Sequence, residues 1–260
     1  MTEKIINDTN RDIVIITETH FSNANVPKMS NFRSFNRNRI SRAKGGVCIF
    51  IREEIARDAI QVFCGEAENE VIAMSLTSLE PKLIIMASYG IQQNTFGTSQ
   101  ADVHVNEIFG QLSNWLDEGA RILWAGDQNL SIGTELLPGN DIYLSPSGKL
   151  FNNLVSRYNL SIANNLDHNP NTHIDLKTKK AKALDLVISN INEDIQNFTI
   201  DHNQEFSPFS IRKTPTERKK IYSDHSAICF YLSIGCNVKN LKSINKPKSW
   251  MYNSVDGKMK

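Results

Sequence analysis

The sequence is poor in cysteine and has no long apolar stretch. Its four cysteines form no C-x-x-C pair and two lie inside strand-like runs, so we expect buried free thiols rather than disulfides or a zinc site. These residues are Cys48, Cys64, Cys229 and Cys236. No apolar run approaches about 18 residues, and no basic-then-apolar leader follows Met1. We therefore expect an intracellular protein that does not span a membrane.

Net charge is also nearly absent, because 29 basic and 28 acidic residues leave a formal charge of +1. This balance argues against a protein coated with nucleic-acid-binding charge. It hides local clusters, since residues 31–44 carry five basic side chains and no acid, and residues 212–220 and the lysine-rich C-terminus are also basic. Such runs are often solvated faces, and they matter for binding only where they flank an active site. At 260 residues the chain fits one large α/β domain.

The stretch at residues 122–129, Ile-Leu-Trp-Ala-Gly-Asp-Gln-Asn, is the one around which the chain is organised. An apolar run closed by glycine is typical of a buried strand, and in α/β sheets ligands gather beyond the carboxyl ends of the strands. Asp127 and Asn129 would lie there, and their i, i+2 spacing puts both side chains on one side of an extended segment. An ordinary Asx turn has the same pattern. The segment therefore predicts either a general base beside an amide donor or a plain turn.

Other apolar runs also end in polar side chains. The strands predicted at 12–18 and 82–88 deliver Glu18 and Tyr89, and the strand predicted at 183–189 contains Asp185. A carboxylate inside a strand needs a partner because an unpaired buried charge is costly. The remaining expected elements are helices at 2–10, 100–116 and 150–158, strands at 45–51, 71–76, 160–164, 195–200 and 227–234, and exposed loops at 21–44 and 131–149.

Seven polar side chains are predicted at strand ends: Glu18, Tyr89, Asp127, Asn129, Asp185, Asp224 and His225. This set fits metal-assisted phosphodiester hydrolysis, in which carboxylates hold a hard cation such as Mg²⁺, a base orients or deprotonates water, and donors meet the charge growing on the phosphate. Asp185 is a better partner for His225 than Asp224, because neighbours on an extended segment point to opposite sides. Each residue alone also fits a cap, a turn or ordinary packing.

The order of these motifs resembles the endonuclease/exonuclease/phosphatase superfamily over residues 11–233. The strand at 12–19 looks like the family's metal-binding strand, Gly-Asp-x-Asn at 126–129 like its central motif, and Ser-Asp-His at 223–225 like its terminal motif. The wording Ile-Ile-Thr-Glu-Thr-His and Tyr-Ser-Asp-His-Ser-Ala-Ile is similar to endonuclease domains of non-LTR (LINE-type) retrotransposons. A reverse transcriptase follows in such elements, and residues 246–252 look like the start of that connection.

The resemblance implies a DNase I-like, four-layer α/β sandwich in which two mixed β-sheets pack face to face with helices outside. It places this domain at residues 1–236, followed by a basic tail or linker at 237–260. The family begins with an Asn-bearing strand before the helix, whereas this chain begins inside that helix. We therefore expect the first strand to be missing, which affects the expectation of activity more than that of the fold and should lower stability.

The resemblance also implies roles on the metal side of the site. Glu18 would bind Mg²⁺, with Mn²⁺ as an alternative, and Asp224 would assist at the metal. Asp127 would orient the attacking water.

On the phosphate side, Asn129 would hold the scissile phosphate and Tyr89 would contact it. His225, oriented by Asp185, would stabilise the transition state. Four further residues are candidates for substrate binding: Thr172, Ser223, Arg39 and Arg42.

These observations predict a Mg²⁺-dependent DNA endonuclease that nicks one strand and leaves a 3′-hydroxyl for priming reverse transcription. Double-stranded DNA and a reverse transcriptase domain of a longer polyprotein would be its partners, and a genomic substrate implies nuclear localisation. Two alternatives stay open: an abasic-site endonuclease or exonuclease of DNA repair, and a catalytically inactive fragment that binds nucleic acid through its basic loops. A small-molecule phosphatase fits the wording of the motifs less well.

Overall fold

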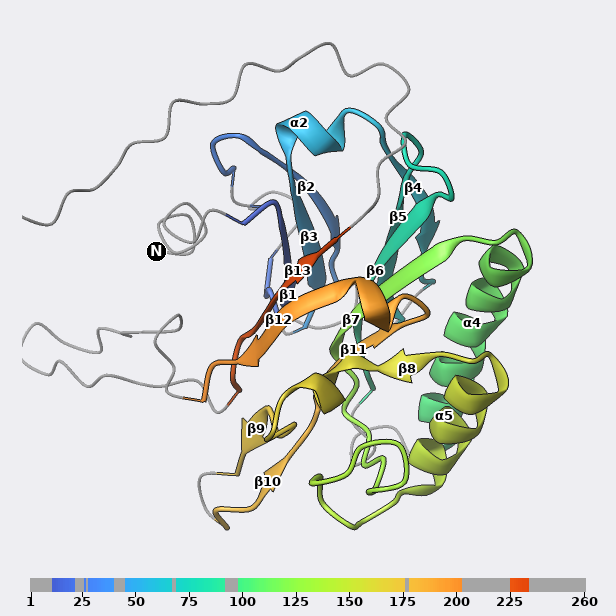
Figure 1. Cartoon of the computed structure of the whole chain (residues 1–260), viewed down its shortest axis with the longest axis vertical. Coiled ribbons are helices and arrows are strands. Elements are labelled where there is room, and N and C mark those ends of the chain that lie inside the picture. The colour runs from blue at the N-terminus through green and yellow to red at the C-terminus, as the bar shows by residue number, and fades with distance from the viewer. Residues whose placement is uncertain are drawn as a thin grey trace, which may run out of the picture.

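The computed structural model describes residues 11–21, 26, 28–39, 45–66, 69–91, 98–175, 178–202 and 225–233 of the chain. The helix expected at 2–10, the basic cluster at 212–220 and the tail from residue 237 lie outside these ranges. The α/β sandwich predicted from the sequence is confirmed. Two layers of sheet pack face to face, and helices cover the outer side of one layer (Figure 1).

The first layer is a single sheet of six strands. Their order is β4 (Ala59–Cys64), β5 (Glu70–Leu76), β6 (Leu83–Tyr89), β7 (Arg121–Asp127), β11 (Asp185–Ser189) and β8 (Ser161–Ile162). Only the β6–β7 pair is parallel. Every residue of β5 and β6 is buried, which explains why their sequences are apolar on both faces.

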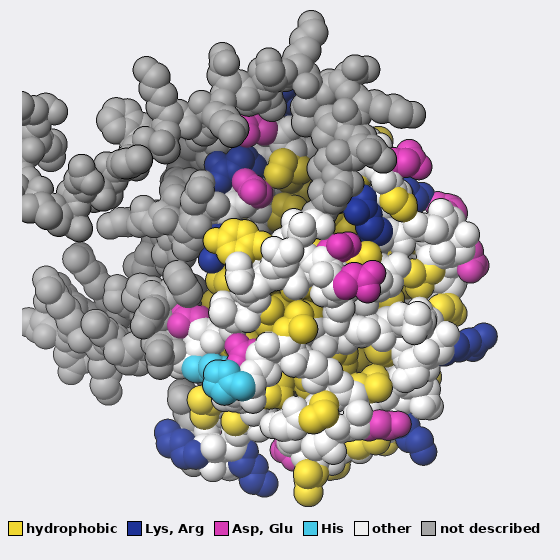
Figure 2. Space-filling view, in the orientation of Figure 1, with side chains coloured by type: hydrophobic (Ala, Val, Ile, Leu, Met, Phe, Trp, Pro, Cys, Tyr) yellow, Lys and Arg dark blue, Asp and Glu magenta, His cyan; other side chains and the backbone are white. Residues whose placement is uncertain are grey.

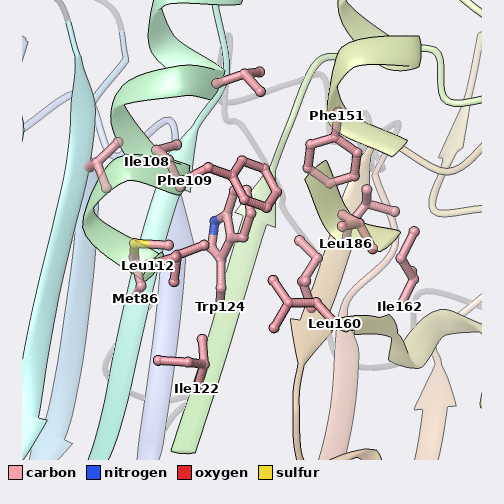
Figure 3. Packing of buried hydrophobic residues seen from close by; sticks show 14 of the residues in the cluster. Met86, Ile108, Phe109, Leu112, Ile122, Trp124, Phe151, Leu160, Ile162 and Leu186 are labelled. Carbon is pink, nitrogen blue, oxygen red and sulfur yellow. The ribbon is translucent and has the colours of Figure 1, made fainter. Parts of the chain in front are cut away.

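Helices α4 (Thr98–Asp117) and α5 (Pro146–Arg157) lie side by side on one face of this sheet (Figure 1). The core beneath them is aromatic at its centre, where Trp124 of β7 meets Phe109 and Phe151 (Figure 3). The three rings pack edge to face, with centroids 5.6 to 5.9 Å apart. Such packing favours one rigid arrangement of helices and sheet.

The second layer packs on the opposite face of the six-stranded sheet and is made of two separate ladders. One has the order β1 (Ile13–Thr17), β3 (Val47–Arg52) and β2 (Phe32–Arg37), and the other pairs β12 (Ile195–Ile200) with β13 (Ile228–Leu232). No ladder joins β1 to β13 among the described residues, although the Arg11 guanidinium carbon lies 5.5 Å from the centre of the Tyr231 ring.

Five short elements complete the described structure. They are α2 (Glu53–Ala56), the hairpin of β9 (His173–Ile174) and β10 (Ala181–Lys182), and the 3₁₀ helices η1 (Ala163–Leu166) and η2 (Asn192–Asp194).

Several predicted elements differ from the structure. The loop expected at 21–44 contains β2, and β4 was not predicted at all. The helix expected from Leu150 begins earlier, at Pro146, because the Ser145 hydroxyl accepts a hydrogen bond from the Gly148 N–H at 3.1 Å and proline suits a first turn. The strand expected at 160–164 is shorter than predicted, because β8 covers only Ser161–Ile162 and η1 begins at Ala163.

The three described cysteines are free thiols, as expected, but they are not equally buried. Cys48 is buried, Cys229 is half-buried and Cys64 is exposed at the end of the edge strand β4, where the expectation of burial was wrong. Burial raises the pKa of the Cys48 thiol to about 12. None of the described helices is long and apolar enough to cross a bilayer.

Candidate active site

Three adjacent strands of the first layer bring three polar side chains into one row. Tyr89 closes β6, Asp127 closes β7 and Asp185 opens β11. In the sheet register Tyr89 lies beside Asp127, and Asp127 lies opposite Asp185. The parallel β6–β7 pair ends at this edge, as expected for a site beyond the carboxyl ends of strands.

The Asp127 side chain is held by Asn129, the residue that the sequence analysis placed beside it. The Asp127 carboxylate accepts hydrogen bonds from the Asn129 backbone N–H at 2.9 Å and the Asn129 amide at 3.2 Å. The geometry is an Asx turn, with Asn129 at a φ of 50°, which is one of the two alternatives that the sequence left open. The Asn129 amide also donates to the Gly90 carbonyl at 3.1 Å, so both of its protons are engaged.

Gly126 lets this turn form against the neighbouring strand. Its φ is +149°, and a Cβ built there would lie 2.0 Å from the Ser88 carbonyl oxygen of β6. The residue after Asp127, Gln128, is buried, and its amide bonds to the Ser88 hydroxyl at 3.0 Å. The Ser88 hydroxyl also accepts the Trp124 indole N–H at 2.7 Å. The turn that carries Asp127 is therefore anchored in the aromatic core.

His225 meets Asp185, as we predicted from the alternation of side chains. The His225 Nδ1 lies 2.7 Å from the Asp185 carboxylate. A carboxylate at Nδ1 fixes the tautomer in which Nδ1 carries a proton, so that Nε2 is the ring atom directed at a ligand. An isolated β-bridge pairs His225 with His173, and the two rings lie 4.8 Å apart in an edge arrangement.

Glu18 reaches the site from the second layer, just beyond the end of β1. The Tyr89 hydroxyl donates a hydrogen bond to the Glu18 carboxylate. Burial raises the pKa of Tyr89, and the bond to Glu18 raises it further, so the phenol stays protonated and acts as a donor. This contact joins the two layers at the site.

Negative charge is concentrated at Asp127. Burial raises its pKa to about 7, the neighbouring Asp185 and Glu18 carboxylates add to the shift, and His225 opposes it. Ligand atoms of Asp127, Asp185 and His225 lie within 4.8 Å of one another, so these residues form a candidate metal-binding group. Crowded carboxylate oxygens suit a hard divalent cation, which would relieve their repulsion.

The candidate metal-binding group differs from the pair that the sequence suggested. Among the described residues, the group contains Asp127 and Asp185 but not Glu18, although Glu18 contributes to the charge at Asp127. Asp224, the other expected metal residue, lies outside the described residues.

Thr172 is placed behind the site rather than along its surface. Its side chain is 1% exposed, and its hydroxyl accepts hydrogen bonds from the backbone N–H groups of Leu184 and Asp185 at 3.1 and 2.9 Å. The Thr172 carbonyl also accepts the N–H of Ser226 at 2.6 Å. Instead of lining the site for substrate, Thr172 connects the backbones that carry Asp185 and His225.

Arg39, the other described candidate for substrate binding besides Thr172, lies beside the Tyr89 ring with its guanidinium carbon 5.8 Å from the ring centre. It forms an ion pair with Glu70, a residue that the sequence analysis did not select. Arg42 and Ser223 lie outside the described residues. On the face shown in Figure 2, the described lysine and arginine side chains are spread out rather than gathered in one patch.

Comparison with known proteins supports the fold. No protein-family model and no curated protein matches the chain. The 3′–5′ exonuclease NExo from Neisseria meningitidis is 12% identical, with a TM-score of 0.66 over 89% of this chain and 93% of that one. An AP endonuclease from Archaeoglobus fulgidus is 14% identical, with a TM-score of 0.65 over 90% and 93%.

A third similar structure is the endonuclease domain of TRAS1, a telomere-specific non-LTR retrotransposon. It is 13% identical and has a TM-score of 0.58 over 88% of this chain and 90% of that one. At identities this low the likeness establishes the fold, and the chemistry has to be argued from the side chains.

Proposed function

Because the chain has the α/β sandwich fold of the endonuclease/exonuclease/phosphatase superfamily, we propose that it is a divalent-metal-dependent nuclease that acts on DNA. The observation that carries the proposal is the convergence of Asp127, Asp185 and His225 on one group of ligand atoms, with Glu18 and Tyr89 joined beside it. Side chains from both layers meet there. A structural ion pair would need only two of them.

Asp127 is the proposed base. Burial and the neighbouring carboxylates raise its pKa to about 7, and the proposed divalent cation beside it would favour the ionised carboxylate that can accept a proton. Asn129 holds the Asp127 carboxylate through two hydrogen bonds, so we assign to Asn129 the orientation of the base. The Asp127 carboxylate would then orient water for attack on phosphorus.

His225 and Tyr89 are the proposed donors to the phosphate. Nδ1 of His225 lies 2.7 Å from Asp185, which would stabilise the imidazolium form of the ring, and in that form Nε2 would donate to the oxygen on which charge grows. The Tyr89 hydroxyl, kept protonated, would contact the same group. These positioned donors supply the electrostatic part of catalysis.

The cation is proposed to be Mg²⁺, with Mn²⁺ as an alternative. The carboxylate oxygens of Asp127 and Asp185 would hold it, together with Glu18, whose charge acts on Asp127. A bound divalent cation neutralises phosphate charge and polarises the reacting phosphodiester.

The finer proposal is that the enzyme nicks one strand of intact duplex and leaves a 3′-hydroxyl for reverse transcription. This finer proposal is supported by the residue sequences of the motifs and by the fold shared with the TRAS1 endonuclease domain. A reverse transcriptase partner and a nuclear location follow from this proposal. The AP endonuclease and exonuclease folds favour a second candidate, cleavage at abasic sites or at strand ends in repair.

The test is relaxation of supercoiled plasmid with Mg²⁺ and with EDTA. We expect Mg²⁺-dependent nicking that falls at least about 100-fold in Asp127→Ala and in His225→Ala. His168→Ala is the matched control, because the His168 ring is 92% exposed and also pairs with an aspartate. Nicking that persists in either site variant would remove the proposal, and DNA binding without any nicking would favour the inactive fragment.

A second assay separates the two candidate reactions. Duplex oligonucleotides with and without one abasic site are cut under the same conditions, and the products are extended by a polymerase. The retrotransposon proposal predicts cleavage of intact duplex, favouring deformable base steps, with extendable 3′ ends. Strong preference for the abasic duplex would support the repair reaction instead.

A further inference from the structure

A second buried carboxylate, Glu70, adjoins the site without belonging to the metal-binding group. It opens β5, is 1% exposed, and lies opposite Tyr89 in the β5–β6 register. Its place at the start of a fully buried strand puts a charge where only a specific partner can compensate it.

Among the described residues, Arg39 is such a partner, and it follows β2 in the second layer. The Arg39 Nε forms an ion pair with one Glu70 oxygen, and the Gly46 backbone N–H donates to the other. The side chains are 14% and 1% exposed, respectively. Because both charges are largely removed from water, loss of either would leave the other badly solvated, and each therefore determines where the other lies.

The backbone at Gly45 is shaped to admit this pair. Gly45 has a φ of +104°, and a Cβ there would lie 2.6 Å from a Glu70 oxygen and 2.9 Å from the Arg39 guanidinium carbon. The Gly45 carbonyl also accepts the His20 N–H at 2.8 Å, two residues beyond Glu18. The segment after Glu18 and the Glu70–Arg39 pair are therefore fixed by the same turn.

The Glu70–Arg39 pair is connected to the active site by Tyr89. The Arg39 guanidinium lies against the Tyr89 ring, 5.8 Å from its centre, and the Tyr89 hydroxyl donates to Glu18. Glu70 engages the guanidinium at Nε, whereas the planar fork of arginine has two further nitrogens that match the geometry of a phosphate. The positively charged Arg39 guanidinium is thus held beside Tyr89, the residue proposed to contact the scissile phosphate.

We propose that Glu70 is a positioning residue that holds Arg39 as a binding site for a backbone phosphate next to the scissile one. This inference rests on the proposed function, because it takes DNA as the ligand. Glu70 takes no part in the proposed hydrolysis itself. The ligand that Arg39 would bind is an anionic phosphate of the DNA backbone.

The direction in which Glu70→Gln changes DNA affinity distinguishes a positioning role from simple charge repulsion. Glu70→Gln removes a negative charge, so simple charge repulsion predicts tighter DNA binding. Positioning predicts the reverse, since Arg39 loses its anchor. We expect weaker binding to a labelled duplex in EDTA, with the slope of log affinity against log salt reduced by about 1, as for loss of one phosphate contact.

Arg39→Met should give the same reduction, and the double variant should bind no more weakly than Arg39→Met alone, because one contact cannot be lost twice. Arg39→Lys keeps the charge but not the fork, so it should raise the KM for nicking more than it lowers kcat. The controls are Arg33→Met and Glu53→Gln, an ion pair between β2 and α2 with side chains 45% and 49% exposed, for which we expect no change.

Circular dichroism and thermal melting establish whether each variant is folded. If Glu70→Gln does not fold, the KM of Arg39→Lys tests the inference instead. Tighter or unchanged binding by a folded Glu70→Gln, or an unchanged KM in Arg39→Lys, overturns the inference and leaves the nuclease proposal intact. Weaker binding by Glu70→Gln with no nicking by the wild type supports Arg39 positioning but removes the nuclease. A wild type that does not bind DNA overturns both.

Discussion

The two sheet layers contribute to the site in different ways. The first layer is one ladder of six strands in which β5 and β6 are buried throughout, and it supplies Tyr89, Asp127 and Asp185. The second layer is divided into two ladders, and every residue of β1 is only half-buried. Glu18 follows β1, and His225 precedes β13. The positions of Asp127 and Asp185 are thus fixed by one continuous sheet, whereas those of Glu18 and His225 depend on how the divided layer packs against that sheet.

The difference follows from what covers each strand. Side chains of β5 alternate between the core under the helices and the core between the sheets, so Val71 and Ile72 are buried in different clusters. The strand β13 has an exposed Tyr231 and rests mainly on the core between the sheets. Burial on both faces gives the first layer more apolar contact per residue, and we expect it to carry most of the stability.

The largest effect should come from the centre of the first layer. Trp124→Ala removes a fully buried indole packed against Phe109 and Phe151, and it should lower the free energy of unfolding by about 3–5 kcal/mol. Phe230→Ala in β13 removes a half-buried ring stacked on Phe198, and about 1–2 kcal/mol is expected. Urea unfolding measures both. Equal losses would break the comparison between the layers.

The next effect is a pH-dependent gain of stability in Asp127→Asn. Folding raises the pKa of Asp127 from 3.8 to about 7, so ionisation opposes the folded state. This penalty is absent below about pH 4, grows between about pH 4 and pH 7, and is complete above that range. In EDTA the variant should therefore be more stable than the wild type above pH 7, by on the order of a few kcal/mol.

Urea unfolding from pH 4 to 8 follows this difference, and Asp12→Asn is the control because the Asp12 side chain is 64% exposed. Added Mg²⁺ should shrink the gap by stabilising the ionised wild type. A gap that widens toward acid pH has the wrong sign for this electrostatic origin.

A smaller effect is expected where the layers are connected. Thr172→Val leaves the buried N–H groups of Leu184 and Asp185 without their hydroxyl acceptor, and should cost about 1–3 kcal/mol of stability. It should also slow nicking by displacing Asp185 from His225. Thr172→Ser keeps the acceptor and should restore both properties. Stability lost in Thr172→Val with nicking unchanged would show that Thr172 supports the fold but not the site.

Much of the fold was predictable because the first layer has the simplest sequence signal. The apolar runs before Tyr89 and Asp127 are continuous, and they predicted β6 and β7 almost to the residue. The strand β2 was missed because Phe-Arg-Ser-Phe-Asn-Arg lies in a basic, polar stretch whose alternation is weak. Its pairing along β3, rather than local propensity, makes it a strand.

The candidate site was predictable only where neighbours in sequence or alternation set the geometry. Asp185 was identified as the partner of His225 because adjacent residues on a strand face opposite ways, and the 2.7 Å contact agrees. Glu70 was missed because a glutamate opening an apolar strand is common, and its partner Arg39 is 31 residues away. The role of Thr172 depended on burial, which the sequence does not state.

The most direct measurement is the single-turnover nicking rate of Asp127→Asn, His225→Gln and the double variant on supercoiled plasmid with Mg²⁺. If one site is built from both layers, each single variant loses at least about 100-fold, and the double variant is little worse than either. A wild-type rate in either single variant, or losses that multiply in the double variant, would contradict a single catalytic unit assembled between the two sheets.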